Sequence, residues 1–131
     1  MIPLKNFVKP RTALIDAVLR NDVRRIDALI RDGADLDGFD GSRNTALIFA
    51  ARDGQYEIAR KLIEAGADPG WIDGERVTPL ILAAYRNHIK IVKFLLSRKV
   101  DRAQRDKWNR TAADYARRRG ANDQIYLLLK E

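Results

Sequence analysis

The seven residues TPLILAA, at positions 78–84, return three more times along the chain in altered form. Every copy opens on a threonine, and consecutive threonines lie 33 residues apart, at Thr12, Thr45, Thr78 and Thr111. The four copies read TALIDAV, TALIFAA, TPLILAA and TAADYAR. A strict period of this length indicates an array of small structural units that stack on one another.

Other positions repeat in the same phase. A glycine or an asparagine follows each threonine by nine residues, at Asn21, Gly54, Asn87 and Gly120. These two residue types best tolerate the left-handed conformation that ends a helix, so we expect a positive φ at all four positions. Thr45, Thr78 and Thr111 are typical helix N-caps, and Pro79 occupies a first helical position, where its missing N–H costs nothing. Each unit is therefore predicted to begin with a short helix.

A second helix is predicted in every unit from apolar residues at helical spacing. In the third unit these residues are Ile89, Val92, Leu95 and Leu96. Loops rich in Gly, Asp and Asn then lead to the next threonine. Because helices this short are marginal in isolation, the units must gain their stability by stacking.

This pattern resembles the ankyrin repeat family. The family motif Thr-Pro-Leu-His-x-Ala-Ala matches residues 78–84 best and residues 45–51 next, and the later signature Gly-Ala-Asp matches residues 33–35 and 66–68. The resemblance covers residues 12–131 with the family's spacing. It implies an all-α solenoid of stacked antiparallel helix pairs, with loops that project as a row of fingers.

A single ankyrin repeat domain is therefore expected over residues 12–131. A basic and apolar arm, residues 1–11, precedes it, and we expect its apolar side chains to cover the first helix pair. Those side chains are Ile2, Leu4, Phe7 and Val8. The predicted repeats span about residues 12–44, 45–77, 78–110 and 111–131.

The sequence departs from the family motif at three positions in the repeat. Isoleucine or aspartate replaces the motif histidine, and apolar packing is expected to replace the hydrogen bond of that ring. Arginine or asparagine replaces the loop glycine; Gly41 and Gly74 lie two residues earlier, so the first two finger tips are expected to turn differently. Lysine replaces the signature glycine in the third repeat. The replaced positions are Ile15, Ile48, Ile81 and Asp114, then Arg43, Arg76 and Asn109, and finally Lys99.

The composition argues against catalysis. The 131-residue chain has no cysteine and a single histidine, His88, so neither a zinc thiolate site nor a histidine-based triad can be assembled in the usual way. No GxxxxGK[ST] or GxGxxG motif occurs to bind a nucleotide. The acidic run at residues 35–41 lacks the final glutamate of a calcium loop, so we interpret its aspartates as repeat-loop residues. We expect no enzymatic activity, no cofactor and no metal.

The N-terminal residues MIPLKNFVKPR do not have the pattern of a secretory signal, because a proline and charges interrupt the apolar run. No apolar segment approaches the roughly 20 residues that a bilayer-spanning helix needs. We therefore expect a cytoplasmic protein that does not contact membranes.

The net charge of +7 is unevenly distributed. Residues 12–77 hold nine Lys or Arg against thirteen Asp or Glu, whereas residues 78–131 hold thirteen against five. This asymmetry favours an acidic surface near the basic end, belonging either to a partner or to another copy of the chain. The alternative is a solvated basic face that only aids solubility.

Members of the ankyrin family bind other proteins, usually through the concave side formed by finger tips and first helices. The residues carried over to that side do not repeat their chemistry every 33 positions, and they are rich in the Arg, Trp and Tyr that often carry binding energy. We expect Tyr85, Arg86, Trp108 and Arg119 to be neighbours that hold an acidic or aromatic segment of a partner protein. The predicted partner-binding residues are Phe39, Arg43, Arg52, Ile72, Arg76, Tyr85, Arg86, Arg105, Lys107, Trp108, Arg118 and Arg119.

Two other functions stay open at this stage. Residues 98–119 hold nine Lys or Arg against three Asp, with Trp108 and Tyr115 among them, a mixture that suits electrostatic nucleic-acid binding. No recognised nucleic-acid motif accompanies it. Tyr126 and Leu127 are apolar at the open end of the last repeat, so the chain could instead be a self-associating structural unit. A monomer is the main expectation.

Overall fold

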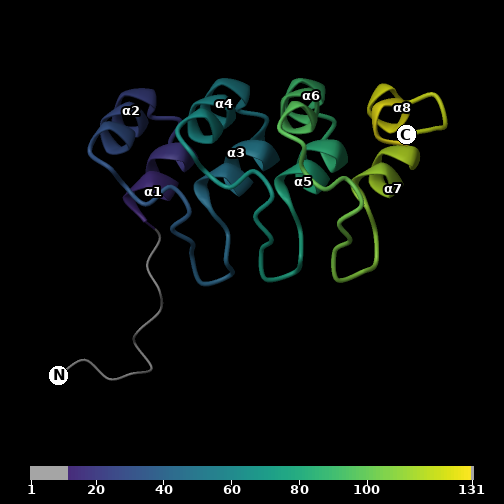
Figure 1. Ribbon diagram of the computed structural model, residues 1–131, viewed down its shortest axis with the longest axis horizontal. Helices are drawn as coiled ribbons and strands as arrows, with labels where there is room; N and C mark the ends of the chain where they lie inside the picture. The colour runs from purple at the N-terminus through teal and green to yellow at the C-terminus, as the bar shows by residue number, and fades with distance from the viewer. Residues whose placement is uncertain (1–11, 131) are drawn as a thin grey trace.

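The computed structural model describes residues 12–130, and the predicted arm at residues 1–11, with its apolar side chains, lies outside that range. The described chain is all-α and forms four helix pairs in a row (Figure 1). A single β-bridge between Phe39 and Thr45 is its only strand-like pairing. The helices are α1 (Ala13–Leu19), α2 (Val23–Arg31), α3 (Ala46–Asp53), α4 (Tyr56–Glu64), α5 (Pro79–Tyr85), α6 (Ile89–Ser97), α7 (Ala112–Arg117) and α8 (Gln124–Leu129).

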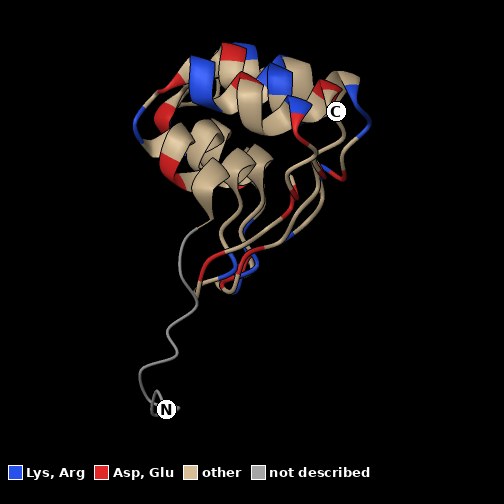
Figure 2. Ribbon diagram, turned by 90° about the vertical axis from the view of Figure 1, so that its left-hand side faces the viewer, with Lys and Arg blue, Asp and Glu red and all other residues tan. Residues whose placement is uncertain are grey.

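The helices form two layers. The first helices of the repeats, α1, α3, α5 and α7, pack side by side, and the second helices lie over them in a parallel row (Figure 1). Three loops leave the helices in one direction, as fingers (Figures 1 and 2). We call the surface made by the first helices and the fingers the finger face. This architecture confirms the predicted ankyrin-type solenoid.

The predicted helix starts are present in all four repeats. Each threonine hydroxyl accepts a hydrogen bond from the backbone N–H three residues later, at 3.1–3.3 Å. In the last repeat Thr111 and Asp114 form a reciprocal capping box, in which the Asp114 carboxylate accepts from the Thr111 N–H at 2.9 Å. Asp114 is exposed, whereas the equivalent Ile15, Ile48 and Ile81 are buried. The last repeat therefore turns a polar residue outward where inner repeats bury an apolar one.

The predicted left-handed positions are also confirmed. The four residues that follow the first helices have positive φ, namely Asn21 (54°), Gly54 (72°), Asn87 (65°) and Gly120 (132°). The three finger tips share a left-handed residue as well, with φ of 63–64° at Arg43, Arg76 and Asn109. The expectation that the first two tips turn differently was therefore wrong. The backbone keeps the turn and accepts the strain of a side chain at each tip.

One aspartate holds each finger together. The carboxylates of Asp40, Asp73 and Asp106 each accept two backbone N–H groups of their own loop, at 2.8–3.0 Å. Neighbouring fingers are joined by backbone bonds in the same register, from Gly74 to Ser42 at 3.0 Å and from Lys107 to Glu75 at 2.9 Å. The fingers therefore form a continuous surface.

Side chains also join consecutive first helices. In each later repeat one side chain donates to a carbonyl near the C-terminal end of the preceding first helix, and the three donors are different residue types. His88 Nε2 lies 3.1 Å from the Arg52 carbonyl, and its ring lies against Gly54, where a Cβ would come within 2.5 Å of it. The other two pairs are Gln55 to Val18 at 3.1 Å and Arg119 to Ala84 at 2.8 Å. The single histidine thus has a structural contact.

Lys99 adopts a positive φ of 58° after α6, where the first two repeats have Gly33 and Gly66. We predict that Lys99→Gly raises the free energy of unfolding by about 0.5 kcal/mol, because roughly 1–2 kcal/mol of left-handed strain outweighs the entropy that glycine costs. Lys93→Gly, inside α6, is the control and should lower it by about 1 kcal/mol. Urea unfolding of both variants measures whether each change raises or lowers the free energy of unfolding. A Lys99→Gly variant that is less stable than wild type would contradict the prediction.

Asp123 caps α8 by accepting from the Tyr126 N–H at 3.0 Å, and it pairs with Arg119 at 2.7 Å. The hydrogen bond from Arg119 holds the pKa of Asp123 below its ordinary value of 3.8 in the folded chain. The stabilisation is therefore present above that value and is lost as the pH falls through the lower folded pKa. We predict that Asp123→Asn, which keeps a capping oxygen, melts a few degrees lower at neutral pH. The difference in melting temperature between wild type and variant should disappear below about pH 4. A difference that persists in acid would contradict this.

Candidate protein-binding surface

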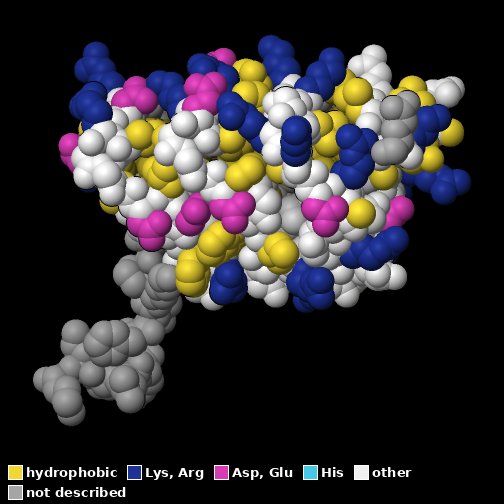
Figure 3. Space-filling view, in the orientation of Figure 1, with side chains coloured by type: hydrophobic (Ala, Val, Ile, Leu, Met, Phe, Trp, Pro, Cys, Tyr) yellow, Lys and Arg dark blue, Asp and Glu magenta, His cyan; other side chains and the backbone are white. Residues whose placement is uncertain are grey.

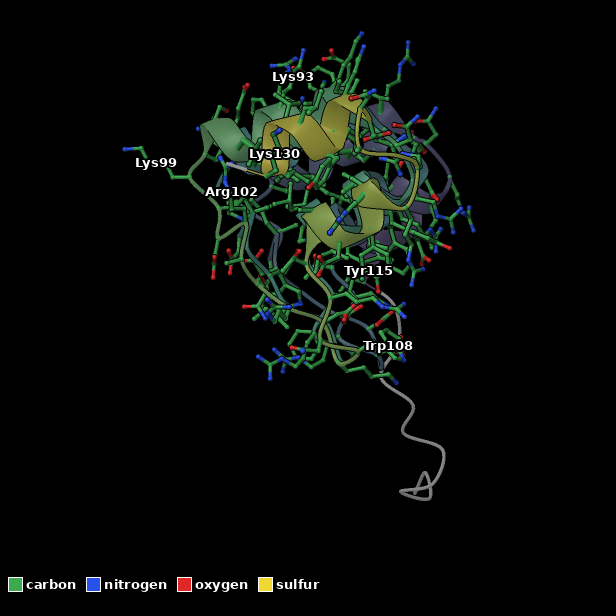
Figure 4. All side chains as sticks on the ribbon, turned by 90° about the vertical axis from the view of Figure 1, so that its right-hand side faces the viewer. Lys93, Lys99, Arg102, Trp108, Tyr115 and Lys130 are labelled. Carbon is green, nitrogen blue, oxygen red and sulfur yellow. The ribbon has the colours of Figure 1, made fainter. Side chains whose placement is uncertain are left out.

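A pocket opens on the finger face between α5, α7 and the finger that joins the third and fourth repeats. Its volume is about 320 Å³ and its lining is mainly apolar. In the end-on view, Tyr115 lies above Trp108, and both lie away from Lys93 and Lys99 (Figure 4). The lining residues are Val77, Ile81, Leu82, Tyr85, Trp108, Arg110, Tyr115 and Arg118.

Three aromatic side chains line the pocket. Tyr85 at the end of α5 meets Tyr115 of α7 edge to face, with ring centroids 5.4 Å apart. Tyr85 is 53% exposed and Trp108, on the finger, is 51% exposed. Aromatic groups with this much free surface in a hollow are typical of sites that a partner covers.

The Tyr115 side chain is held in place by a hydrogen bond to the neighbouring finger. Its hydroxyl donates a hydrogen bond to Asp106, which is buried and also accepts the backbone N–H groups of Trp108 and Arg110. Desolvation raises the pKa of Tyr115, and the hydrogen bond to Asp106 raises it further. The phenol is therefore a neutral, fixed donor at neutral pH. Asp106 thus orients three of the residues that line the pocket.

Cations surround the aromatic rings. Arg118 and Arg110 lie over Tyr115 at 5.6 and 5.8 Å, and Arg86 lies over Tyr85 at 5.7 Å. Within residues 12–130, none of these three arginines has a carboxylate at salt-bridge distance. Lys107 lies over Trp108 at 4.6 Å and pairs with Glu75 at 2.8 Å. The pocket therefore has an apolar lining and a positive rim. Basic side chains are not confined to the pocket, because dark-blue side chains also occur along the face that Figure 3 turns to the viewer.

Sequence reasoning placed Tyr85, Trp108 and Arg118 on the binding surface, and the structure brings these three to one pocket. Arg86 contacts the pocket through Tyr85. Tyr115 and Arg110 were not among the predicted site residues. The sequence did contain a signal for Tyr115, because the equivalent positions of the other repeats hold aspartate, phenylalanine and leucine. A first-helix position with such varied chemistry is not fixed by the core.

Arg119, which was expected beside Tyr85 and Trp108, does lie next to Tyr85 and donates to its carbonyl at 3.3 Å. It also donates to the Ala84 carbonyl and pairs with Asp123. Its guanidinium is therefore engaged within the chain. This geometry gives Arg119 a structural contact that spacing alone did not indicate.

Phe39 and Arg43 lie in a separate cluster on the first two fingers. Phe39 packs on Trp71 with centroids 5.5 Å apart, and Arg43 lies over both rings at 4.9 and 5.1 Å. The Trp71 indole N–H donates to the Arg43 carbonyl at 2.7 Å. These contacts join two fingers, so Trp71 fills the space between them.

The remaining predicted residues are distributed along the finger face. Arg52 pairs with Asp53 at 2.8 Å, a hydrogen bond that raises the pKa of Arg52 and lowers that of Asp53. Arg105 donates to the Asn109 carbonyl at 2.9 Å. Ile72 and Arg76 are exposed on the second finger. None of them lines the pocket.

The basic stretch 98–119 is divided between different surfaces. Lys99 and Arg102 lie at the helix end of the end-on view and Trp108 lies at the finger end (Figure 4). Arg102 donates to the Leu128 carbonyl, and Lys107 is paired as described above. At the end of the array, Tyr126 is half-buried and Leu127 is 40% exposed.

Among residues 12–130, no group of three or more His, Cys, Asp or Glu is placed to hold a metal ion. No helix in the same range combines the length and the apolarity required to span a bilayer.

Two family models match the sequence. One, described as ankyrin repeats (3 copies), matches residues 3–73, and the other, described as ankyrin repeats (many copies), matches residues 62–116. No curated protein matches the chain. The first model alone covers more than half of the 131 residues, and both descriptions agree with the helix pairs and fingers seen in the structure. The chain therefore belongs to the ankyrin repeat family.

Proposed function

We propose that this chain is a non-catalytic interaction module that binds a partner protein through the finger face of its basic C-terminal half. Ankyrin repeats are generally protein–protein interaction modules, which supports the class of function. One observation carries the choice of surface: Tyr85 and Trp108 are half-exposed in one pocket whose arginines lack carboxylate partners among the described residues. The fold itself does not select a partner.

The chemistry of the pocket defines what the partner surface must provide. Tyr, Trp and Arg carry most of the binding energy at many interfaces, and they act from partly enclosed, desolvated positions. Here the apolar area of Tyr85 and Trp108 requires an apolar counterpart. The cations Arg86, Arg110 and Arg118 are electrostatically complementary to carboxylates or similar anions on a partner. A partner segment with acidic and aromatic or aliphatic residues satisfies both.

Electrostatic binding of nucleic acid along residues 98–119 is supported less. A nucleic-acid groove needs its cations on one continuous surface. Lys99 and Arg102 lie away from Trp108, and Lys107 already pairs with Glu75. Self-association through Tyr126 and Leu127 rests only on their partial exposure.

The test is affinity capture by the full chain from a nuclease-treated native lysate, with washes at low and high salt. We predict that wild type retains one or two proteins at high salt, and that Tyr85→Ala/Trp108→Ala binds them at least about 30-fold more weakly, the loss of roughly 2 kcal/mol expected of an anchor. Both side chains are half-exposed, so the melting temperature should stay within about 3 °C. Titration of the purified partner against each chain measures the ratio.

Leu127→Ala is the matched control, because it removes an exposed apolar side chain from α8, outside the finger face. It should retain the partner. Equal binding by the double variant would overturn the proposed surface. Loss of every partner after nuclease treatment or at high salt would favour nucleic acid, and loss in Leu127→Ala with a concentration-dependent size would favour self-association.

A further inference from the structure

We propose that the pocket between α5 and α7 receives one apolar side chain of the partner, aromatic or leucine-sized, while Arg110 and Arg118 bind a carboxylate directly beside it. This inference rests on the proposed function and specifies the chemistry of the bound segment. The partner is thus recognised by a short pattern, an apolar residue flanked by Asp or Glu, rather than by charge alone.

The size of the pocket limits the occupant. Ligand pockets usually measure about 300–1,000 Å³, and this one, at about 320 Å³, lies at the lower limit. It is large enough for one aromatic or leucine-sized side chain. Half-buried Val77 and Leu82 form apolar parts of the lining, and the half-exposed rings of Tyr85 and Trp108 add to it. A polar side chain here would lose water without gaining enough hydrogen bonds.

The rim charges exclude cationic groups. A cluster of aromatic rings can bind an ammonium group through the ring faces. Here Arg110 and Arg118 already lie over Tyr115, and Lys107 lies over Trp108. A second cation would be repelled at short range, whereas a carboxylate could accept from the guanidinium groups. The pocket therefore selects an apolar residue with an anion beside it.

The pocket is preformed by a contact that the other fingers cannot make. Asp106 binds the backbone of Trp108 and Arg110 and the hydroxyl of Tyr115. The equivalent first-helix residues in the two preceding repeats are Phe49 and Leu82, which have no hydroxyl. Only this finger is therefore fixed to its following helix by such a bond. A rigid pocket loses less entropy when a ligand binds, so a short segment could be enough for recognition.

The charge of the chain's own N-terminal arm argues against that arm as the occupant of the pocket. Residues 1–11 contain Lys5, Lys9 and Arg11 and no acidic residue. The positive rim would repel such a segment. The occupant is therefore a different protein, with acidic residues beside an apolar one.

The experiment uses the isotope-labelled full chain and three blocked tripeptides, Asp-Phe-Glu, Lys-Phe-Lys and Asp-Ala-Glu, titrated to about 10 mM so that millimolar affinity is measurable. The chain has two tryptophans, and their indole N–H signals give a site probe with an internal control. Trp108 lines the pocket, whereas the Trp71 indole is bonded to Arg43 in the other finger cluster. We expect the shift of the Trp108 signal to give a dissociation constant for Asp-Phe-Glu that is at least tenfold lower than those of the other two peptides. The Trp71 signal should not move.

A double variant separates binding of the carboxylate by the arginines from binding of the apolar side chain in the pocket. The double variant Arg110→Gln/Arg118→Gln should bind Asp-Phe-Glu at least tenfold more weakly than wild type. Its affinity for a blocked Ala-Phe-Ala peptide should change less than twofold. Lys93→Gln, on the outer face of α6, is the matched charge control and should change neither. The Trp71 signal reports that each variant is folded.

Several outcomes would overturn the inference. Equal binding of Lys-Phe-Lys would remove the anionic requirement, and equal binding of Asp-Ala-Glu would remove the apolar one. An unmoved Trp108 signal in a folded chain would show that the pocket does not take such a peptide. If this occurs while Tyr85→Ala/Trp108→Ala still loses its captured partner, the proposed function stands and only the ligand chemistry fails. If the peptides bind selectively but that double variant keeps its captured partner, the proposed function fails.

Discussion

The packing of each first helix against the next is the contact on which the rest of the molecule depends. The helices α1, α3, α5 and α7 contain only six to eight residues, too few to be stable alone. They become stable because each buries its apolar side between neighbours, as α3 does with six consecutive buried residues. The threonine caps, the left-handed helix ends and the carbonyl contacts of His88 and Arg119 all preserve this spacing.

That spacing also determines the finger face. Once consecutive repeats are in register, the fingers bond to each other through their backbones, and an aspartate fixes the turn of each. The side chains on this surface are then free to vary. The first two fingers use that freedom for the internal cluster of Phe39 and Trp71, and the third uses it for a pocket with a positive rim. The fingers therefore differ in the side chains that they carry on one shared backbone scaffold.

The period of the sequence predicted the helix pairs, their caps and the left-handed residues, because these depend on local backbone requirements that every repeat shares. It did not predict that Arg43 and Arg76 would keep the glycine-like turn, since stacking of the fingers overrides the local preference. It also missed Tyr115. The bond between Tyr115 and Asp106 joins a helix to a finger through one side chain, which no repeat pattern encodes. Contacts between repeats depend on shape, so charge and spacing located the pocket only in part.

The most direct test of the proposed surface is hydrogen–deuterium exchange of the full chain with and without its captured partner. Binding at the finger face predicts slower exchange in residues 77–86 and 105–118, because the partner covers α5, α7 and the finger between them. The second helices α4 and α6 should exchange at unchanged rates. Protection confined to α6 and α8, with none around Tyr85 and Trp108, would contradict the proposal that this ankyrin repeat protein binds through its basic finger face.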